Sequence, residues 1–281
     1  MLYFFIVFFS TTLGSLTGMG GGIIIKPLLD MLGNFAVSDI GLLSSITVLV
    51  MAIISVGKLS LSETRHAPIV PSFAISLTVG SVLGGNLGHE LFSLLLSHRL
   101  NNSSITLLQN ILLALIVAIV VIYMLSSPTH RKPPRFGPMC PSAIQAPNLS
   151  HIILKNSIPA LFSGILLGTI STFLGIGGGP INIAFLIFFF ALDTKSSVIY
   201  SLICILFAQT SQLLLLTISL SADFSGYNLH ILPFMIPGAI IGGFLGASLN
   251  KKLSEKHVRF SFIFAQFIVL CICIINICKN L

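Results

Sequence analysis

The sequence contains very little charge. Asp, Glu, Lys and Arg make up 7% of its 281 residues, whereas about a quarter of a soluble globular protein is charged. Hydrophobic residues make up 55%, so too little polar surface is left to cover a folded chain in water. This composition excludes an ordinary cytosolic enzyme and predicts an integral membrane protein.

Motifs of several other protein classes are also missing. The five cysteines show no paired spacing, so neither a disulfide framework nor a metal site is expected. The glycine runs match neither a dinucleotide fingerprint nor a phosphate loop, no hydrolase motif is present, and we expect no enzymatic activity and no cofactor. The 14 basic residues outnumber the 7 acidic ones, but they lie between apolar runs, so no nucleic-acid partner is expected. The apolar N-terminal segment lacks the basic start of a cleaved signal and is expected to be retained.

What the sequence does contain is a series of apolar segments. Six have about the 20 residues that a bilayer crossing requires. Two are much longer, and glycines interrupt each near its middle. A segment rich in proline and basic residues, 126–156, separates four of these runs from the other four and predicts a solvated linker between a first repeat, 1–125, and a second, 157–281. The apolar runs are Leu2–Leu32, Ile40–Val56, Pro68–Leu96, Ile105–Leu125, Ile158–Leu192, Val198–Leu220, Leu229–Leu249 and Phe260–Cys278.

Two glycine patterns occur once in each half. Gly18–Gly22 reads G-M-G-G-G, and Gly175–Gly179 reads G-I-G-G-G at an offset of 157. A later set of four spaced glycines recurs at an offset of 158, and glycines four apart lie on one helix face, where they favour helix packing over a direct substrate role. The later set is Gly80, Gly84, Gly85 and Gly88, matched by Gly238, Gly242, Gly243 and Gly246.

The basic residues predict how the chain is threaded through the membrane. If every segment crosses once, the 14 positive charges divide seven to seven and indicate no orientation. If each glycine-broken segment leaves on the side it entered, they divide eleven to three, with the linker and Lys251–Arg259 on the richer, cytoplasmic side. We therefore predict an all-α integral membrane protein of the plasma membrane. It has two inverted repeats, each with a glycine-broken helical hairpin plus three transmembrane helices, and both termini are extracytoplasmic.

The two glycine bends predict a binding site for a small anion. Glycine lets backbone N–H groups approach a ligand, and a helix that starts there has a positive dipole end. The first bend contributes Gly20, Gly21 and Gly22, with Lys26 one turn later, and the second contributes Gly177, Gly178 and Gly179. Two alternatives are open: the glycines serve close packing or a hinge, and the lysine extends to the membrane interface.

Polar residues inside the apolar segments are further candidates. Ser44 and Ser201 correspond at the offset of 157, Asn182 follows the second bend, and Gln209 and Ser211 lie in the sixth segment. Neutral hydroxyls and amides can bind an oxyanion without a second buried charge, although each can equally bond within or between helices. His89 and Glu90 are candidates for carrying a proton or for a simple interfacial pair.

These repeated motifs resemble those of the sulfite exporter TauE/SafE family. The resemblance rests on Gly18–Gly22, Gly175–Gly179 and the two later glycine sets, and it covers nearly the whole chain outside the linker. It implies a transporter of sulfite, a sulfonate such as sulfoacetate, or thiosulfate. At the offset of 157, Pro27 of the first repeat corresponds to Ala184 of the second. This difference leaves open whether the two hairpins contribute equally to the binding site.

The sequence thus predicts a secondary transporter that works by alternating access. Its expected partners are a small sulfur oxyanion, membrane lipid, and a coupling ion that is either a proton or sodium. A passive anion channel and a membrane scaffold without substrate are the competing interpretations.

Overall fold

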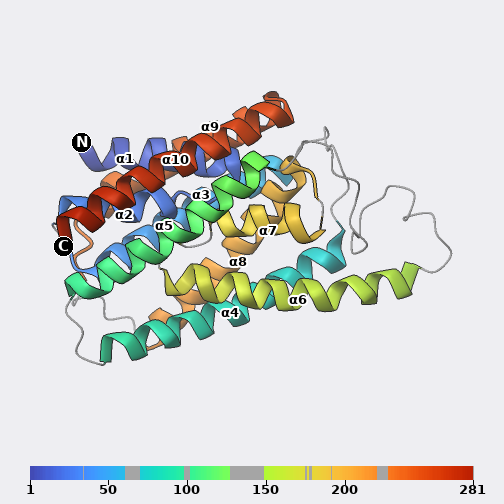
Figure 1. The fold of residues 1–281 in the computed structure, drawn as a ribbon, viewed down its shortest axis with the longest axis horizontal. Coiled ribbons are helices and arrows are strands. Elements are labelled where there is room, and N and C mark those ends of the chain that lie inside the picture. Colours follow the sequence, from blue (N-terminus) through green and yellow to red (C-terminus); the bar gives the residue numbers. More distant parts are fainter. Residues whose placement is uncertain are drawn as a thin grey trace.

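The structure, a computed structural model, is an elongated bundle of helices (Figure 1). It describes residues 1–33, 35–60, 70–97, 102–126, 149–174, 176, 179–190, 192–219 and 227–280. Within these ranges all regular secondary structure is helical, which confirms the predicted fold class. The helices are α1 (Leu2–Thr17), α2 (Gly22–Leu32), α3 (Val37–Ser60), α4 (Pro71–Ser97), α5 (Asn102–Ser126), α6 (Leu149–Phe173), α7 (Pro180–Phe190), α8 (Thr194–Ser219), α9 (Leu232–Lys252) and α10 (Glu255–Asn280).

Five of the described helices are long and apolar enough to cross a membrane. They span Val37–Ser60, Ile105–Ser126, Thr194–Ile218, Leu232–Lys252 and Glu255–Lys279. On α5, large apolar side chains that recur every three or four residues are more than half exposed: Leu115, Ile119 and Ile122. An outward apolar stripe of this kind suits contact with lipid and agrees with an integral membrane protein.

Glycines break the first long apolar segment into two half-helices, as predicted. Gly18, the residue that follows α1, has φ 74°, and Gly20 has φ 73°. Few L-residues adopt this left-handed conformation, so glycine is needed for the chain to turn back into α2. The second long segment is likewise divided between α6 and α7, although Gly175, Gly177 and Gly178 lie outside the described residues. α6 also begins at Leu149, inside the segment predicted as linker.

The later glycine sets are packing surfaces, and each packs against the opposite half. A Cβ added to Gly80 of α4 would lie 2.1 Å from the carbonyl oxygen of Leu161 on α6. One added to Gly84 would lie 2.0 Å from the carbonyl oxygen of Ile165. On α9, an added Cβ at Gly246 would lie 2.3 Å from Thr12 O on α1. The contacts advance along both partners in the same direction, so α4 runs parallel to α6, and α9 runs parallel to α1.

One end of the bundle, here called the terminal end, carries both chain termini (Figure 1). The rings of Tyr3 and Phe35 meet there edge to face with centroids 6.0 Å apart, and Lys279 Nζ donates to Met31 O at 2.9 Å. α1 therefore starts where α2 ends, so the first hairpin enters and leaves at the terminal end.

The other end is here called the basic end. There Thr194 N donates to Glu255 Oε1 at 2.9 Å, and Val70 N, just before α4, donates to Tyr200 Oη at 2.9 Å. α6 runs parallel to α4 from this end and α8 begins here, so the second hairpin enters and leaves at the basic end. Two hairpins that open in opposite directions and pack reciprocally favour the interpretation of inverted repeats.

Candidate functional site

The two helix bends touch each other inside the bundle. A Cβ added to Gly22 would lie 2.4 Å from Ile176 O in the second bend and 2.9 Å from Ser44 Oγ. Ser201 Oγ donates to Gly18 O at 2.7 Å. Ser44 and Ser201, which the offset of 157 relates, therefore both lie against the first bend, and glycine at position 22 is required by the close approach.

The other described glycines of the bends are also in close contact. An added Cβ at Gly14 of α1 would lie 2.4 Å from Gly21 N and 2.7 Å from the carbonyl carbon of Gly20, and one at Gly21 would lie 2.9 Å from Thr11 Cγ2. Packing accounts for glycine at positions 21 and 22, and the positive φ accounts for Gly20. An anion cradle formed by their backbone stays a prediction. In the second bend, an added Cβ at Gly179 would lie 3.2 Å from Ile176 Cδ1.

Lys26 lies inside the bundle and does not extend to an interface. Its side chain is only 3% exposed, and Nζ donates to Gln109 Oε1 and to Leu174 O, each at 2.6 Å. Gln109 Nε2 donates in turn to Phe173 O at 2.9 Å. The first hairpin thus places its ammonium at the C-terminal end of α6, which is the negative end of that helix dipole.

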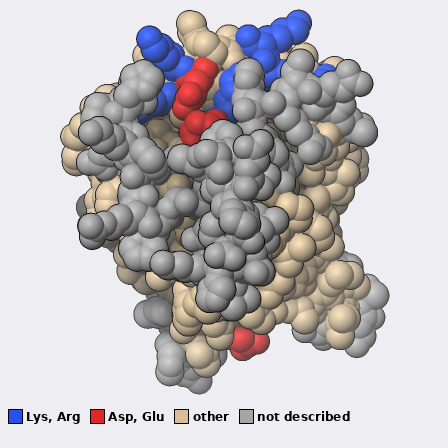
Figure 2. Space-filling view, turned by 90° about the vertical axis from the view of Figure 1, so that its right-hand side faces the viewer, with Lys and Arg blue, Asp and Glu red and all other residues tan. Residues whose placement is uncertain are grey.

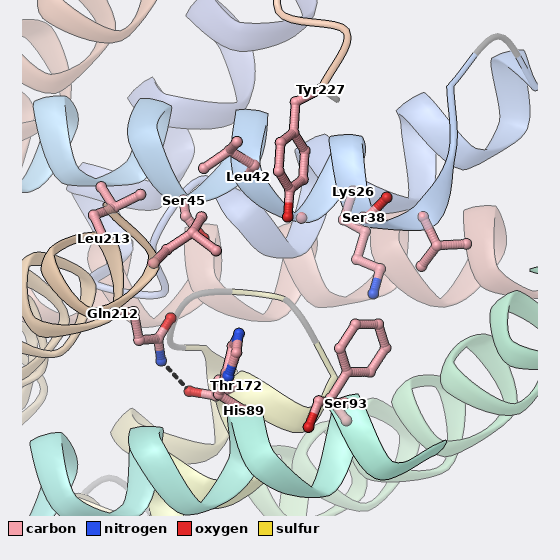
Figure 3. A pocket seen from close by; sticks show the side chains of 14 residues that line it. Lys26, Ser38, Leu42, Ser45, His89, Ser93, Thr172, Gln212, Leu213 and Tyr227 are labelled. Atoms are coloured by element: carbon pink, nitrogen blue, oxygen red, sulfur yellow. Dashed lines mark hydrogen bonds between the residues drawn. The ribbon is translucent and has the colours of Figure 1, made fainter. Parts of the chain in front are cut away.

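A cavity of about 290 Å³ adjoins this lysine. The Lys26 ammonium and the His89 ring enter it from opposite sides (Figure 3). The start of α3 and the ends of α4 and α8 form its walls, so it lies on the terminal-end side of the bends. The lining residues are Lys26, Val37, Ser38, Gly41, Leu42, Ser45, His89, Phe92, Ser93, Thr172, Gln212, Leu213, Leu216 and Tyr227.

A second, much smaller cavity of about 10 Å³ lies beside the first. Thr172 lines both cavities and accepts a hydrogen bond from Gln212 Nε2 (Figure 3). The small cavity is lined by Ser81, Gly168, Ser171, Thr172, Asn182, Cys204, Ile205, Ala208 and Gln209.

The residues predicted from sequence are therefore distributed over three places. Lys26 lines the large cavity, Asn182 and Gln209 line the small one, and Ser44 and Ser201 lie at the contact between the bends. Ser211 is half-buried and lines neither cavity. Gly177 and Gly178 lie outside the described residues.

Sequence reasoning missed Gln109 and Thr172. Gln109 is an amide inside the apolar run Ile105–Leu125, and a buried amide in a membrane-spanning helix is itself a signal for a functional contact. Thr172 precedes the second bend by three residues, and no sequence pattern distinguishes it from a threonine that bonds within its own helix. Only the fold places it between the two cavities.

Comparison with known proteins agrees with this architecture. The model of the family described as sulfite exporter TauE/SafE matches residues 3–273. A curated relative, the "Probable membrane transporter protein YunE" of Bacillus subtilis (strain 168), is 25% identical over 251 residues, which cover 88% of this chain and 87% of the relative. No solved structure matches. Because the family model matches nearly the whole chain, this membrane protein belongs to the sulfite exporter TauE/SafE family.

Proposed function

We propose that the protein is a secondary transporter for a small sulfur-containing oxyanion, such as sulfite, thiosulfate or a sulfonate. The observation that carries this proposal is the cavity of about 290 Å³ with the Lys26 ammonium on its wall. The family description supports a sulfur oxyanion as the substrate class.

The groups around the large cavity suit an anion. Lys26 supplies one full positive charge, and two of its three donor protons are used by Gln109 and Leu174. Hydroxyls of Ser38 and Tyr227 and the amide of Gln212 line the same space, and such neutral donors bind an oxyanion without a second buried charge. The lining residues include no carboxylate that would repel the ligand.

Alternating access accounts for the arrangement of the bends and the cavity. The hairpins open toward opposite ends and meet between them, and the large cavity lies on the terminal-end side only. On the basic-end side, the polar residues near the first bend are packed: Ser55 Oγ donates to Ser15 Oγ at 2.7 Å, and both side chains are fully buried. Closure on one side of a binding cavity favours a transporter over a continuous channel.

The charges orient the protein in this proposal. Figure 2 shows the basic end, with Lys and Arg side chains gathered along its upper rim. Described basic residues at this end are Lys58, Lys195, Lys251, Lys252, Lys256 and Arg259. By the positive-inside rule, this distribution supports the sequence-based prediction of a cytoplasmic basic end with both termini outside the plasma membrane. A proton or sodium gradient supplies the driving force.

Transport of radiolabelled sulfite into proteoliposomes tests the proposal. We expect uptake that saturates with sulfite concentration, accelerates with a trans load of unlabelled sulfite, and responds to an ion gradient. Uptake that follows voltage alone without saturation would show that the protein is a passive channel. If the protein neither took up nor bound sulfite, the interpretation as a scaffold without substrate would stand.

A further inference from the structure

The small cavity holds a cluster of oxygen atoms without partners. Ser171 Oγ, Asn182 Oδ1 and Gln209 Oε1 are buried and have no hydrogen-bond partner among the described residues. The three side chains are 4%, 5% and 1% exposed. Each buried polar atom left unsatisfied costs about 1–3 kcal/mol, so three around one cavity indicate that a ligand satisfies them.

The corresponding positions in the first half show that the fold does not require polar residues where Ser171, Asn182 and Gln209 stand. At the offset of 157, Gly14, Ile25 and Ala52 correspond to Ser171, Asn182 and Gln209. The helices around the two places pair reciprocally, α4 with α6 and α9 with α1. The first half thus forms the corresponding helix pair with residues that need no polar partner, so the oxygens of the second half serve another purpose.

The volume and chemistry of the small cavity define the ligand. About 10 Å³ accepts one particle of roughly water size, which is too small for sulfite or a sulfonate. The donors are neutral oxygens, which suit a hard cation, and a divalent cation would normally be matched by carboxylates, which the lining lacks. Ser171 and Thr172 also belong to the last turn of α6, and the C-terminal ends of half-helices coordinate sodium in other transporters.

We propose that Ser171, Thr172, Asn182 and Gln209 form a sodium site that couples sodium to the anion in the large cavity. The coupling, though not the sodium site itself, rests on the proposed function. Thr172 lines both cavities, so the cation and the anion occupy neighbouring positions. Lys26 repels sodium while the large cavity lacks an anion, and a bound oxyanion offsets that repulsion. Each ligand therefore raises the affinity for the other by the same factor.

Binding measurements on the purified full-length protein test the site. Affinity for ²²Na⁺ and the midpoint of thermal unfolding are measured in sodium, potassium and choline chloride at equal ionic strength, with and without potassium sulfite. We expect sodium alone among the three cations to raise the midpoint, and sulfite to raise sodium affinity at least fivefold. Sodium that acts no differently from potassium would overturn the proposal and identify the ligand as a structural water.

Two variants remove one oxygen each. Asn182→Leu and Gln209→Met should each lower sodium affinity about tenfold or more. In sodium-free buffer both should unfold at or above the wild-type temperature, because each removes an unsatisfied buried oxygen. Thr210→Val is the matched control, since Thr210 Oγ1 donates to Leu206 O within its own helix.

The outcomes separate this inference from the proposed function. If both variants bind sodium as the wild type does, the site is overturned. Sulfite binding without any sodium effect would overturn the site and leave the anion transporter standing. Sodium binding without any sulfite binding would leave the site standing and remove the proposed function.

Discussion

The two ends of the bundle are built from matching helices, yet among the described residues a corresponding pair of side chains borders a cavity at one end and is packed together at the other. At the terminal end, Thr172 and Gln212 are bonded to each other beside a space of about 290 Å³. At the basic end, the residues that correspond to them at the offset of 157 are Ser15 and Ser55. Both are fully buried, and Ser15 Oγ also donates to Gly243 O at 2.9 Å.

This difference teaches that side-chain size decides whether the corresponding pair packs together or borders a cavity. The short hydroxyls of Ser15 and Ser55 allow α1, α3 and α9 to approach closely, whereas Gln212 is a longer side chain beside Gly85. Charge is also unequal: Lys26 corresponds to Ile183, and Gln209 to Ala52. The halves share their packing, while the chemistry for binding is concentrated around the end of α6.

The largest effect is expected from filling the reciprocal glycine contacts. Gly84→Ala and Gly242→Ala should each lower the free energy of unfolding by about 3 kcal/mol, because the new Cβ would lie 2.0 Å from Ile165 O or 2.1 Å from Thr11 Oγ1. Unfolding of the detergent-solubilised protein measures this loss. Gly57→Ala is the control, since an added Cβ there has no described atom within 4 Å. Equal losses at positions 84 and 242 would show that both halves depend on the same packing, and a comparable loss at position 57 would contradict the explanation.

The next largest effect is expected from removing the positive charge of Lys26, which has no charged counterpart in the second half. Lys26→Met should weaken binding of divalent thiosulfate by about 1–3 kcal/mol, the size of a hydrogen bond to a charged group. The loss should be smaller for a monovalent sulfonate, because the Coulomb energy scales with ligand charge. Isothermal titration of the purified protein measures both affinities.

Lys279→Met serves as the control for this charge. Lys279 is exposed at the terminal end and donates to Met31 O, away from the residues that line the large cavity. Thiosulfate affinity should be unchanged in this variant. If Lys26→Met bound thiosulfate as tightly as the wild type, the lysine would serve only to tie α2 to the end of α6.

Weakening the closed end should shift the protein toward the opposite state. Ser55→Ala removes the hydrogen bond to Ser15, worth about 1 kcal/mol, and should lower the population that is open at the terminal end about fivefold. The measurement is the labelling rate of a cysteine introduced at Ser45, which lines the large cavity, in an otherwise cysteine-free protein. Ser248→Ala is the control, because Ser248 Oγ is exposed and bonds within α9. An unchanged labelling rate in Ser55→Ala would show that this hydrogen bond does not hold the basic end closed.

The smallest effect is expected at Ser211, which sequence reasoning placed in the site. Ser211→Ala should change sulfite affinity by less than about 0.5 kcal/mol, as for a residue outside the binding machinery. The neighbouring change Gln212→Leu removes a residue that lines the large cavity, and it should weaken binding by about 1 kcal/mol. Equal losses for the two variants would restore Ser211 as a binding residue and would place the substrate on a different face of α8.

Much of the fold could be predicted because membrane insertion leaves strong local signals. Apolar runs interrupted by glycine predicted the broken segments, since irregular backbone at membrane depth has to be buried in protein. Glycines four residues apart predicted the packing faces of α4 and α9, which the contacts at Gly80 and Gly242 confirm. The predicted linker stays a prediction: residues 127–148 lie outside the described residues, and α6 begins at Leu149, within the predicted segment.

The site could be predicted only in part, because its residues meet across long sequence distances. Lys26 was a candidate by type and spacing, but its partners Gln109 and Leu174 come from α5 and from the end of α6. Asn182 and Gln209 were separate candidates, and their shared cavity depends on how α7 packs against α8.

The sequence by itself determined that this chain is a helical membrane protein, and it predicted two related halves, because composition, apolar run length and glycine spacing act locally along the chain. The tertiary structure alone decided which residues line the cavity of about 290 Å³. Serine, lysine and glutamine can each bond within a helix, between helices or to a ligand. Only the packing of helices distant in sequence brings Ser55 into a hydrogen bond with Ser15 and places Gln209 beside a cavity.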